Sequence, residues 1–493
     1  MKLFQYRLSF CRKIYTAMIM SFILFLPACY SNFHVNNLFD FSESSSHKTT
    51  NEEDTYATLV AAHHPRILQA HGGTYRNPKL EHILANIISK LAAVSYDPNQ
   101  TYRMTILDST NINAFALPGG YIYVTRGMLT LANDSSEVAA ILAHEIAHIT
   151  ANHGILRFQK EAELRRADHL PRHILPSANT KPHDTLNDQQ KLAQFSRNQE
   201  LQADSIGIEM LAQAGYDPFA LPRFLKSMEA YNTFRNLSSN TQSSLNFLAT
   251  HPTTPKRINL AMEKARTFKT AKIASTDRSV FLKSIDGIIF SGSLHEGYVR
   301  GKNFIHPQLR ITFSVPNTFT IETHTNTVVA SGPNKIAFRF DAVSLAENIS
   351  ASDYLKSGWM TGLDESSIQP ITIQGLKAAH AYASNENWQF DVVVISMNNQ
   401  VFRLITAAPH QSSNFHSIAH NITHSFRSLS REDLQKLKPL KIRVTRVKQG
   451  NSIASLAYQM QETPHQEELF RIINGLSSEE ILHVGSFVKI IAE

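Results

Sequence analysis

His144-Glu145-Ile146-Ala147-His148 is the stretch on which the fold and the chemistry of this chain depend. On a helix, residues four positions apart lie on the same face, one turn apart, so the imidazoles of His144 and His148 can bind one metal ion. Glu145 points partly to the side, where it can reach a water activated by that ion. The stretch therefore predicts a helix that carries two zinc ligands and a general base for hydrolysis.

The residues around this stretch decide whether it is a chance string. In a chain with 23 histidines, the pattern arises by chance in on the order of a few per cent of sequences. Here the flanking residues are almost all apolar, and burying two histidines and a glutamate among them without a partner would be costly. A core role explains one buried histidine but not three polar side chains. The apolar neighbours are Val138, Ala139, Ala140, Ile141, Leu142, Ala143, Ile146, Ala147 and Ile149.

The sequence contains residues that favour a helix start before this stretch and a helix stop after it. Asp134 can accept hydrogen bonds from the free amides of the first turn, and Glu137 follows it at the spacing of a capping box. Gly154 is the predicted stop. The predicted helix therefore spans the whole metal-binding stretch.

A catalytic zinc ion takes three protein ligands and keeps one position open. Glu200 is the predicted third ligand, because Asp204 follows it by one helical turn. In such a pair the first carboxylate can bind metal while the second accepts a hydrogen bond from a ligand histidine and sets its tautomer. The alternative is a solvated acidic face, which the apolar residues Ala203, Ile206 and Ile208 disfavour.

The residues before the metal-binding stretch predict a small sheet beside helices. An apolar stripe at steps of three and four predicts an amphipathic helix over 80–91. Residues 102–107 predict a strand, and 113–124 predict two extended pieces around a Pro-Gly-Gly turn. We therefore expect an α+β chain whose first folded domain, 56–270, is mainly helical.

Together, His144 to His148 followed by Glu200 and Asp204 resemble the gluzincin metallopeptidases, a zincin family, and more narrowly the bacterial envelope branch of BepA-like and HtpX-like enzymes. The resemblance covers roughly residues 56–269. Further stretches match that family: Asn113-Ala114-Phe115-Ala116 with Pro118-Gly119-Gly120, Gly215-Tyr216-Asp217-Pro218, and Thr250-His251-Pro252 through Arg257-Ile258.

The resemblance implies a cofactor and further site residues. It implies one zinc ion per chain, and a substrate-binding edge strand against which an extended peptide pairs through backbone hydrogen bonds. It also implies that His251 approaches the metal, either as a catalytic donor in the transition state or as a regulatory fourth ligand. Without the resemblance, His251 would be interpreted as a helix-capping or surface histidine. The substrate-binding residues are Asn113, Ala114, Phe115 and Ala116.

The segment between the two predicted site helices, 153–190, holds three prolines and many polar residues, which predicts a mobile excursion. Helical structure is expected to resume near Leu192. Four histidines in or near this segment have no regular spacing and no acidic partner pattern, so we predict surface histidines and not a second metal site. They are His153, His169, His173 and His183.

The N-terminus resembles an export signal. Basic residues precede the apolar run 17–26, which is too short for a comfortable membrane span. The run ends in Leu26-Pro27-Ala28-Cys29, which resembles the lipobox of bacterial lipoproteins. Residues 1–28 are the predicted signal peptide and Cys29 the predicted lipidation site, with an ordinary secretory signal as the alternative. Residues 29–55 are polar and predict a flexible tether.

Charge and cysteine content restrict the partners. The predicted signal carries four of the seven surplus positive charges, which leaves +3 for the mature chain. The sequence has no arginine-rich run and no ladder of basic and aromatic residues, so nucleic acid is not an expected partner. Cys29 would be the only cysteine of the mature chain, which excludes an internal disulfide.

Two further domains are expected. Residues 278–428 contain alternating β-type segments and predict an α+β domain whose role is not readable. Residues 440–493 resemble a LysM-type module with the order strand, helix, helix, strand. Members of that family more often have Asp-Thr where this chain has Asn451-Ser452, so peptidoglycan binding and simple packing against the peptidase domain both stay open.

These observations predict an exported zinc endopeptidase, lipid-anchored at Cys29 to the outer membrane and facing the periplasm, which cuts misfolded or misassembled envelope proteins. One alternative is a chaperone-like assembly factor whose protease activity is held latent by His251. Another is a peptidoglycan-binding scaffold with a decayed site, which the presence of both Glu145 and Glu200 disfavours. The natural substrate and the oligomeric state are not encoded in any motif.

Overall fold

A computed structural model describes residues 64–157, 159–160, 185–239, 246–268, 277–292, 297–324, 327–345, 349–460 and 465–493. They form two compact units. The helical unit consists of the described residues within 47–235, 243–291 and 439–493, and the sheet unit consists chiefly of those within 292–438. Both helices and strands are present, which confirms the predicted α+β class.

Several predictions fall outside the described residues. The predicted signal peptide 1–28, the lipidation site Cys29 and the tether 29–55 are among them, as is most of the predicted excursion between the site helices. Among the residues that are described, no helix has both the length and the apolar character needed to cross a membrane.

In the helical unit, α3 (Pro78–Ala93) forms on the predicted apolar stripe. The side chain of Asn77 caps the helix by accepting a hydrogen bond from the backbone N–H of Leu80. The stripe faces the core, because five of its residues are buried: Leu80, Leu84, Ile87, Ile88 and Leu91. The helix packs against α5, which carries the metal-binding stretch.

The predicted small sheet is present as three strands, β1 (Arg103–Leu107), β2 (Ala114–Leu117) and β3 (Tyr121–Thr125), in the order β1-β3-β2. β3 pairs in parallel with β1 and antiparallel with β2. Gly120 closes the turn between β2 and β3, where a Cβ atom would lie 2.1 Å from the carbonyl oxygen of Thr101. Only glycine fits so close to another backbone, and β2 is left as an edge strand.

Helix α5 (Ser135–Thr150) begins where the capping signals predicted. The side chain of Asp134 accepts from the Glu137 N–H at 2.8 Å, and the Glu137 carboxylate accepts from the backbone N–H of Asn133 at 2.8 Å. The predicted stop at Gly154 is wrong. The helix ends at Thr150 because Asn152 adopts the left-handed conformation, with φ 52°, which asparagine tolerates better than most residues.

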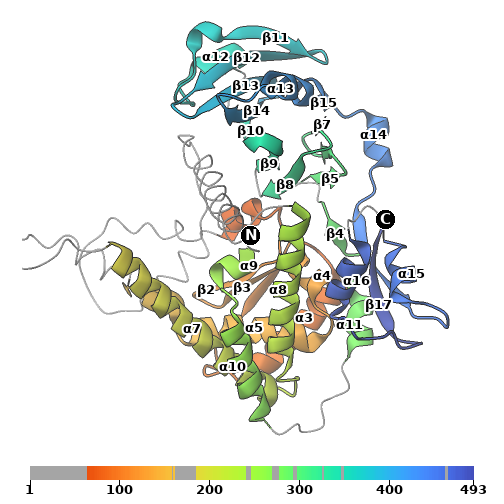
Figure 1. Ribbon diagram of the computed structural model, residues 1–493. Helices are drawn as coiled ribbons and strands as arrows, with labels where there is room; N and C mark the ends of the chain where they lie inside the picture. The colour runs from red at the N-terminus through yellow and green to blue at the C-terminus, as the bar shows by residue number, and fades with distance from the viewer. Residues whose placement is uncertain are drawn as a thin grey trace, which may run out of the picture. The chain divides into compact units, whose positions relative to one another are not determined.

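Helix α7 (Thr185–Gln213) runs beside α5 (Figure 1) and begins earlier than the predicted Leu192. The approach is close, since a Cβ atom on Gly207 would lie 3.3 Å from the backbone nitrogen of His144. The remaining helices of this part are α4 (Arg126–Leu131), α8 (Ala220–Ser239), α9 (Asn246–Thr250) and α10 (Pro255–Arg266).

The C-terminal segment belongs to the helical unit. It contains β16 (Leu440–Arg446), α15 (Ile453–Ala457), α16 (Gln466–Asn474) and β17 (Phe487–Ala492), in the predicted order strand, helix, helix, strand. Its apolar residues share one hydrophobic cluster with α3, α5 and α7. Two elements that precede the sheet unit pack with this C-terminal segment: α11 (Arg278–Ile285) and β4 (Ile289–Ser291). β4 pairs with β16, so the segment forms a three-stranded sheet in the order β17-β16-β4.

The sheet unit is built on seven antiparallel strands in the order β11-β12-β13-β14-β10-β9-β8. Both faces of the interior strand β13 are buried. Val393 and Ile395 lie in a cluster with α13, and the alternate residues Val392 and Val394 lie in a cluster with α12. A second sheet has the order β15-β7-β6-β5. The elements are β5 (Tyr298–Arg300), β6 (Asn303–His306), β7 (Ile311–Ser314), β8 (Thr320–His324), β9 (Thr327–Ser331), β10 (Ala337–Ser344), α12 (Ala351–Lys356), β11 (Gln369–Ile373), β12 (Leu376–Ser384), β13 (Trp388–Met397), β14 (Gln400–Pro409), α13 (Phe415–His424), β15 (Arg427–Ser428) and α14 (Arg431–Lys436).

Candidate metal centre

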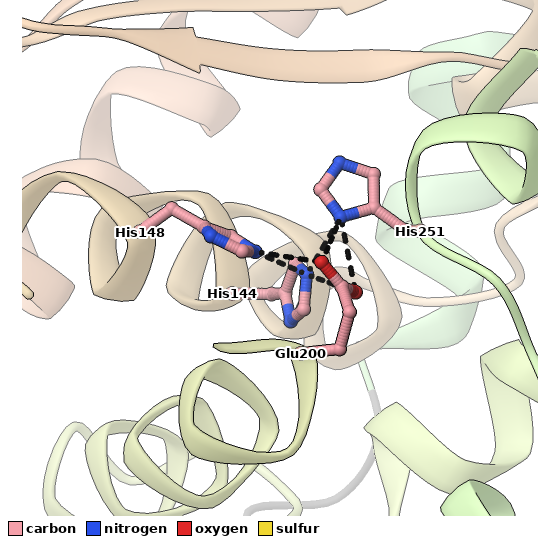
Figure 2. Close-up of side chains that lie close together, drawn as sticks. All are labelled: His144, His148, Glu200 and His251. Carbon is pink, nitrogen blue, oxygen red and sulfur yellow. Dashed lines mark hydrogen bonds and ion pairs between the residues drawn. The ribbon is translucent and has the colours of Figure 1, made fainter. Parts of the chain in front are cut away.

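Four side chains from three parts of the helical unit converge on one point (Figure 2). His144 and His148 extend from α5, Glu200 from α7, and His251 directly follows α9. One ligand atom from each lies within 4.8 Å of the others. The structure therefore brings together all three predicted metal ligands and His251.

The convergent atoms are the ones a divalent ion needs. Nε2 of His148 lies 3.0 Å from Nε2 of His144, and Nδ1 of His251 lies 3.2 Å from the same His144 atom. The Glu200 carboxylate is 3.0 Å from His251 and 3.4 Å from each of the other two rings. Three imidazole nitrogens and one carboxylate form a set that zinc binds tetrahedrally. The residues present fit the ion.

The predicted general base lies beside this cluster. Glu145 is 2% exposed, and its Oε1 atom has no hydrogen-bond partner among the described residues. Nε2 of His251 is 3.6 Å from that oxygen. A buried carboxylate oxygen without a partner is costly unless a ligand or a water uses it.

Asp204 lies where its spacing from Glu200 predicted. Its Oδ1 atom forms an ion pair with His144 at 3.0 Å from Nδ1, while Nε2 of the same ring faces the cluster. Asp204 in turn receives hydrogen bonds from Arg257 on α10, at 2.6 Å from Nε and 2.8 Å from Nη2. α10 therefore holds the carboxylate in place.

The two ligand histidines of α5 differ in protonation. Burial by itself lowers the pKa of His144, but the hydrogen bonds and charges of Asp204 and Glu200 outweigh it and raise the pKa to about 9. Burial lowers the pKa of His148 to about 3, against the opposing effect of Glu200. At neutral pH His148 has a free lone pair, whereas His144 carries a proton that a divalent ion would displace.

The two carboxylates are held ionised. Burial raises the pKa of Glu200, but the charge of His251 and hydrogen bonds from the three histidines outweigh it and hold the pKa well below its ordinary value. Burial likewise raises the pKa of Asp204, and the Arg257 guanidinium more than compensates, so this pKa is also lowered. Both groups therefore stay anionic at neutral pH, as a ligand and its orienting partner require.

The prediction that His153 is a surface histidine is wrong. The side chain is buried, and its Nδ1 atom lies 2.9 Å from Nδ1 of His148. The one signal in the sequence is a third imidazole five residues after His148, and no acidic residue at a matching spacing accompanies it. The other three histidines of that group, His169, His173 and His183, lie outside the described residues.

Two arginines received no role from the sequence. Arg257 lies in a stretch that resembles the family, and besides Asp204 it donates to the backbone carbonyls of His251 and Pro252, at 3.1 and 3.2 Å. Arg223 on α8 donates to Asp134 and Glu137 at the start of α5 and to Asp217. Side chains that brace a site from distant elements have no local pattern, so only the folded chain identifies them.

The predicted substrate strand adjoins the cluster through α9. The backbone N–H of Phe247 donates to the carbonyl of Ile112, immediately before the predicted stretch Asn113 to Ala116. The ring of Phe247 stacks on the ring of His251, with 4.6 Å between the centroids. The edge strand β2 and the metal cluster are therefore linked by one helix.

The part of the chain that contains this cluster is similar to known proteins. Residues 76–265, less than half of the chain, match the family model described as Peptidase family M48. Over 227 residues the chain is 27% identical to the beta-barrel assembly-enhancing protease of Yersinia pestis, which is 44% of this chain and 46% of that protein. Over 206 residues it is 28% identical to the mitochondrial metalloendopeptidase OMA1 of Schizosaccharomyces pombe. The matched part covers 42% of this chain and 57% of that protein.

The beta-barrel assembly-enhancing protease of Escherichia coli K12 is 25% identical over 221 residues, 43% of this chain and 44% of that protein. The chain thus spans about half the length of the curated relatives it matches. A crystal structure of a Bacteroides thetaiotaomicron protein covers 33% of this chain and 57% of that one at 16% identity, with a TM-score of 0.23. The family match and the names of the relatives confirm the prediction of a metallopeptidase region.

Proposed function

We propose that the helical unit is a zinc endopeptidase that binds one ion through His144, His148 and Glu200, with Glu145 as the general base. The observation that carries this proposal is the convergence of ligands from α5 and α7 beside a buried, unpartnered carboxylate oxygen of Glu145. A purely structural histidine cluster would not need a buried carboxylate oxygen without a hydrogen-bond partner at its edge.

Zinc, when bound, lowers the pKa of a coordinated water and polarises the scissile carbonyl of the substrate. The residues of the chain do the rest. Glu145 accepts the proton of the attacking water at Oε1 and later delivers it to the leaving amine. Asp204 keeps the proton of His144 on Nδ1, so that Nε2 faces the ion.

We infer that the substrate binds as an added strand on β2. Asn113 pairs with Thr125, since the Thr125 N–H donates to the Asn113 carbonyl at 3.0 Å. Backbone groups of an antiparallel strand alternate in direction, so those of Ala114 and Ala116 point away from β3, toward the open edge. An extended peptide could pair there in any sequence, which suits an endopeptidase that acts on unfolded segments.

We also propose that the protein acts on misfolded or misassembled envelope proteins, from the periplasm and through a lipid anchor at Cys29. The support is the predicted signal and lipobox, together with bacterial relatives named beta-barrel assembly-enhancing proteases. The LysM-like order of the C-terminal segment supports peptidoglycan as a further partner. Retention of the full chain on isolated peptidoglycan would support that partner, and absence of retention would argue against it.

A second function, a chaperone-like assembly factor with latent protease activity, is favoured by one observation. Nδ1 of His251 lies among the ligand atoms, at 3.0 Å from Glu200 and 3.2 Å from His144, where it would fill the position that a catalytic zinc keeps open. Changing His251 to Ala separates the two roles. Faster cleavage would support latency, and slower cleavage would support a transition-state donor.

The experiment that tests the peptidase function compares wild type with Glu145→Gln. We expect about one zinc per chain in both proteins, and cleavage of casein that falls by about 10²–10⁴-fold in the variant, because general base catalysis contributes that much. Equal cleavage by both proteins would remove the mechanism. Absence of zinc from purified, zinc-supplied wild type would remove the function.

A further inference from the structure

His153 lies one chain reversal beyond the metal-binding helix. The left-handed residue Asn152 turns the backbone, so that His153 folds back against the outer edge of His148. The carbonyl oxygen of His153 accepts from Nε2 of Gln199 at 3.0 Å, which ties the turn to α7. His153 is 3% exposed, so the ring is fixed among protein atoms.

The ring of His153 has one contact on each nitrogen. Nδ1 lies 2.9 Å from Nδ1 of His148, and Nε2 lies 3.2 Å from Oε1 of Gln202. His148 uses its other nitrogen, Nε2, toward the cluster. The contacts form a chain from α5 to α7 in the order His148, His153, Gln202.

The position of each proton in this chain follows from metal binding. A histidine that gives the Nε2 lone pair to an ion must carry its proton on Nδ1. Nδ1 of His153 must then accept that proton's hydrogen bond, so the proton of a neutral His153 sits on Nε2 and is donated to Gln202. The Gln202 oxygen can only accept, so each hydrogen bond in this series is donated in the direction from His148 to Gln202.

We propose that His153 is a positioning residue for the metal, which orients His148 and holds it in the tautomer that leaves Nε2 free, with Gln202 as the end of the chain. The inference rests on the proposed function and extends it. His144 has the equivalent support from Asp204 on the same helix α7. His144 thus contacts a carboxylate, whereas His148 contacts a neutral imidazole that in turn contacts an amide. The second arrangement adds no further charge beside the buried cluster.

The test measures zinc affinity by competition with a chromophoric chelator, and the visible spectrum of the cobalt-substituted protein. His153→Phe keeps a ring but removes the acceptor. Outer-shell changes of this kind weaken metal binding by about 10–100-fold, which we expect here together with an altered cobalt spectrum. His153→Asn places an oxygen near the former Nδ1 position, and should restore both the affinity and the spectrum.

Two controls separate positioning from general damage. Gln202→Leu lies on an exposed position and leaves the fold intact, so it should weaken zinc by a smaller factor and add nothing in the His153→Phe background. His306→Phe removes a buried histidine of the sheet unit and should leave zinc affinity unchanged.

Unchanged zinc affinity and cobalt spectrum in folded His153→Phe would overturn the positioning role, even if wild type binds zinc and cleaves peptides. If His153→Phe does not fold, an unchanged zinc affinity in Gln202→Leu overturns the proposed series of hydrogen bonds from His148 through His153 to Gln202. A wild type that binds no zinc would overturn both the function and this inference, so the two failures are distinguishable.

Discussion

Arg257 and Asp204 form a two-point ion pair inside the helical unit, with Nε 2.6 Å from Oδ2 and Nη2 2.8 Å from Oδ1. Both residues are buried. The same guanidinium reaches Glu200 at 2.9 Å and the backbone carbonyl of His251. One side chain on α10 therefore holds the third predicted ligand, the carboxylate behind His144 and the loop that carries the fourth member of the cluster.

Arg257→Met should destabilise the protein by about 3–5 kcal/mol, because it removes the buried guanidinium that pairs with both Asp204 and Glu200 and leaves these two carboxylates with only His144 and His251 as partners. Urea unfolding of the metal-free protein measures this loss. The double variant Arg257→Met with Asp204→Asn should recover part of it, since the uncompensated charge is gone. A loss below about 1 kcal/mol in the single variant would mean that the pair is solvated in solution.

Zinc affinity should depend on pH through His144. Because the pKa of His144 is raised to about 9, the metal-free protein holds a proton there at neutral pH, and zinc must displace it. Affinity should therefore rise about tenfold per pH unit up to pH 9 and level off above it. Competition titrations from pH 6.5 to 9.5 measure the slope.

Asp204→Asn is the matched control for this dependence. It removes a negative charge and the hydrogen bond that raise the pKa of His144, so the slope should flatten at a lower pH. The same slope and the same plateau in both proteins would show that another group supplies the released proton.

Ala116→Pro should impair cleavage of extended peptides without removing zinc. Proline has no N–H and cannot donate from the β2 edge to a substrate strand. Losing one hydrogen bond worth about 1 kcal/mol lowers kcat/KM by about fivefold. Steady-state kinetics measures this change, and Ala116→Val, which keeps the N–H, should cleave like wild type. Equal effects of the two substitutions would place the substrate elsewhere.

Lys489→Met should loosen the C-terminal segment. Lys489 on β17 is fully buried, and its Nζ atom donates to the carbonyls of Thr130, Leu131 and Ala132 at the end of α4, at 2.8–3.0 Å. Losing the donor leaves buried acceptors unpaired, at a cost of about 1–3 kcal/mol. Chemical denaturation measures it, with the exposed Lys448→Met as control. Equal free energies of unfolding for the two variants would contradict a stabilising contact between Lys489 and the end of α4.

The local parts of the site were predictable from sequence. The helix α5, the shared face of His144 and His148 and the cap at Asp134 all depend on residues within one or two turns of each other. The strands around Gly120 and the apolar stripe of α3 depend on equally short patterns. Such features need only the geometry of one helix or one hairpin.

Glu200 could also be predicted as a ligand from a local pattern, because Asp204 follows it by one helical turn. Its place beside the α5 histidines was an expectation, since 52 residues separate it from His148 along the chain and no local pattern sets that distance. Resemblance to a family supplied the expectation for His251 as well. The packing of α7 against α5, which is close at Gly207, is what brings these groups together.

The residues with the chemistry to hold a metal can be identified from the sequence, because donor type and helical spacing are local properties. The side chains that support these residues can be identified only in the folded chain. His153 looked like a loop residue until the turn at Asn152 buried it, Arg257 gained its role from three elements that meet, and Lys489 finds its acceptors more than 350 residues away. Burial and pairing of this kind arise only when distant segments pack, since no window of the sequence contains both partners.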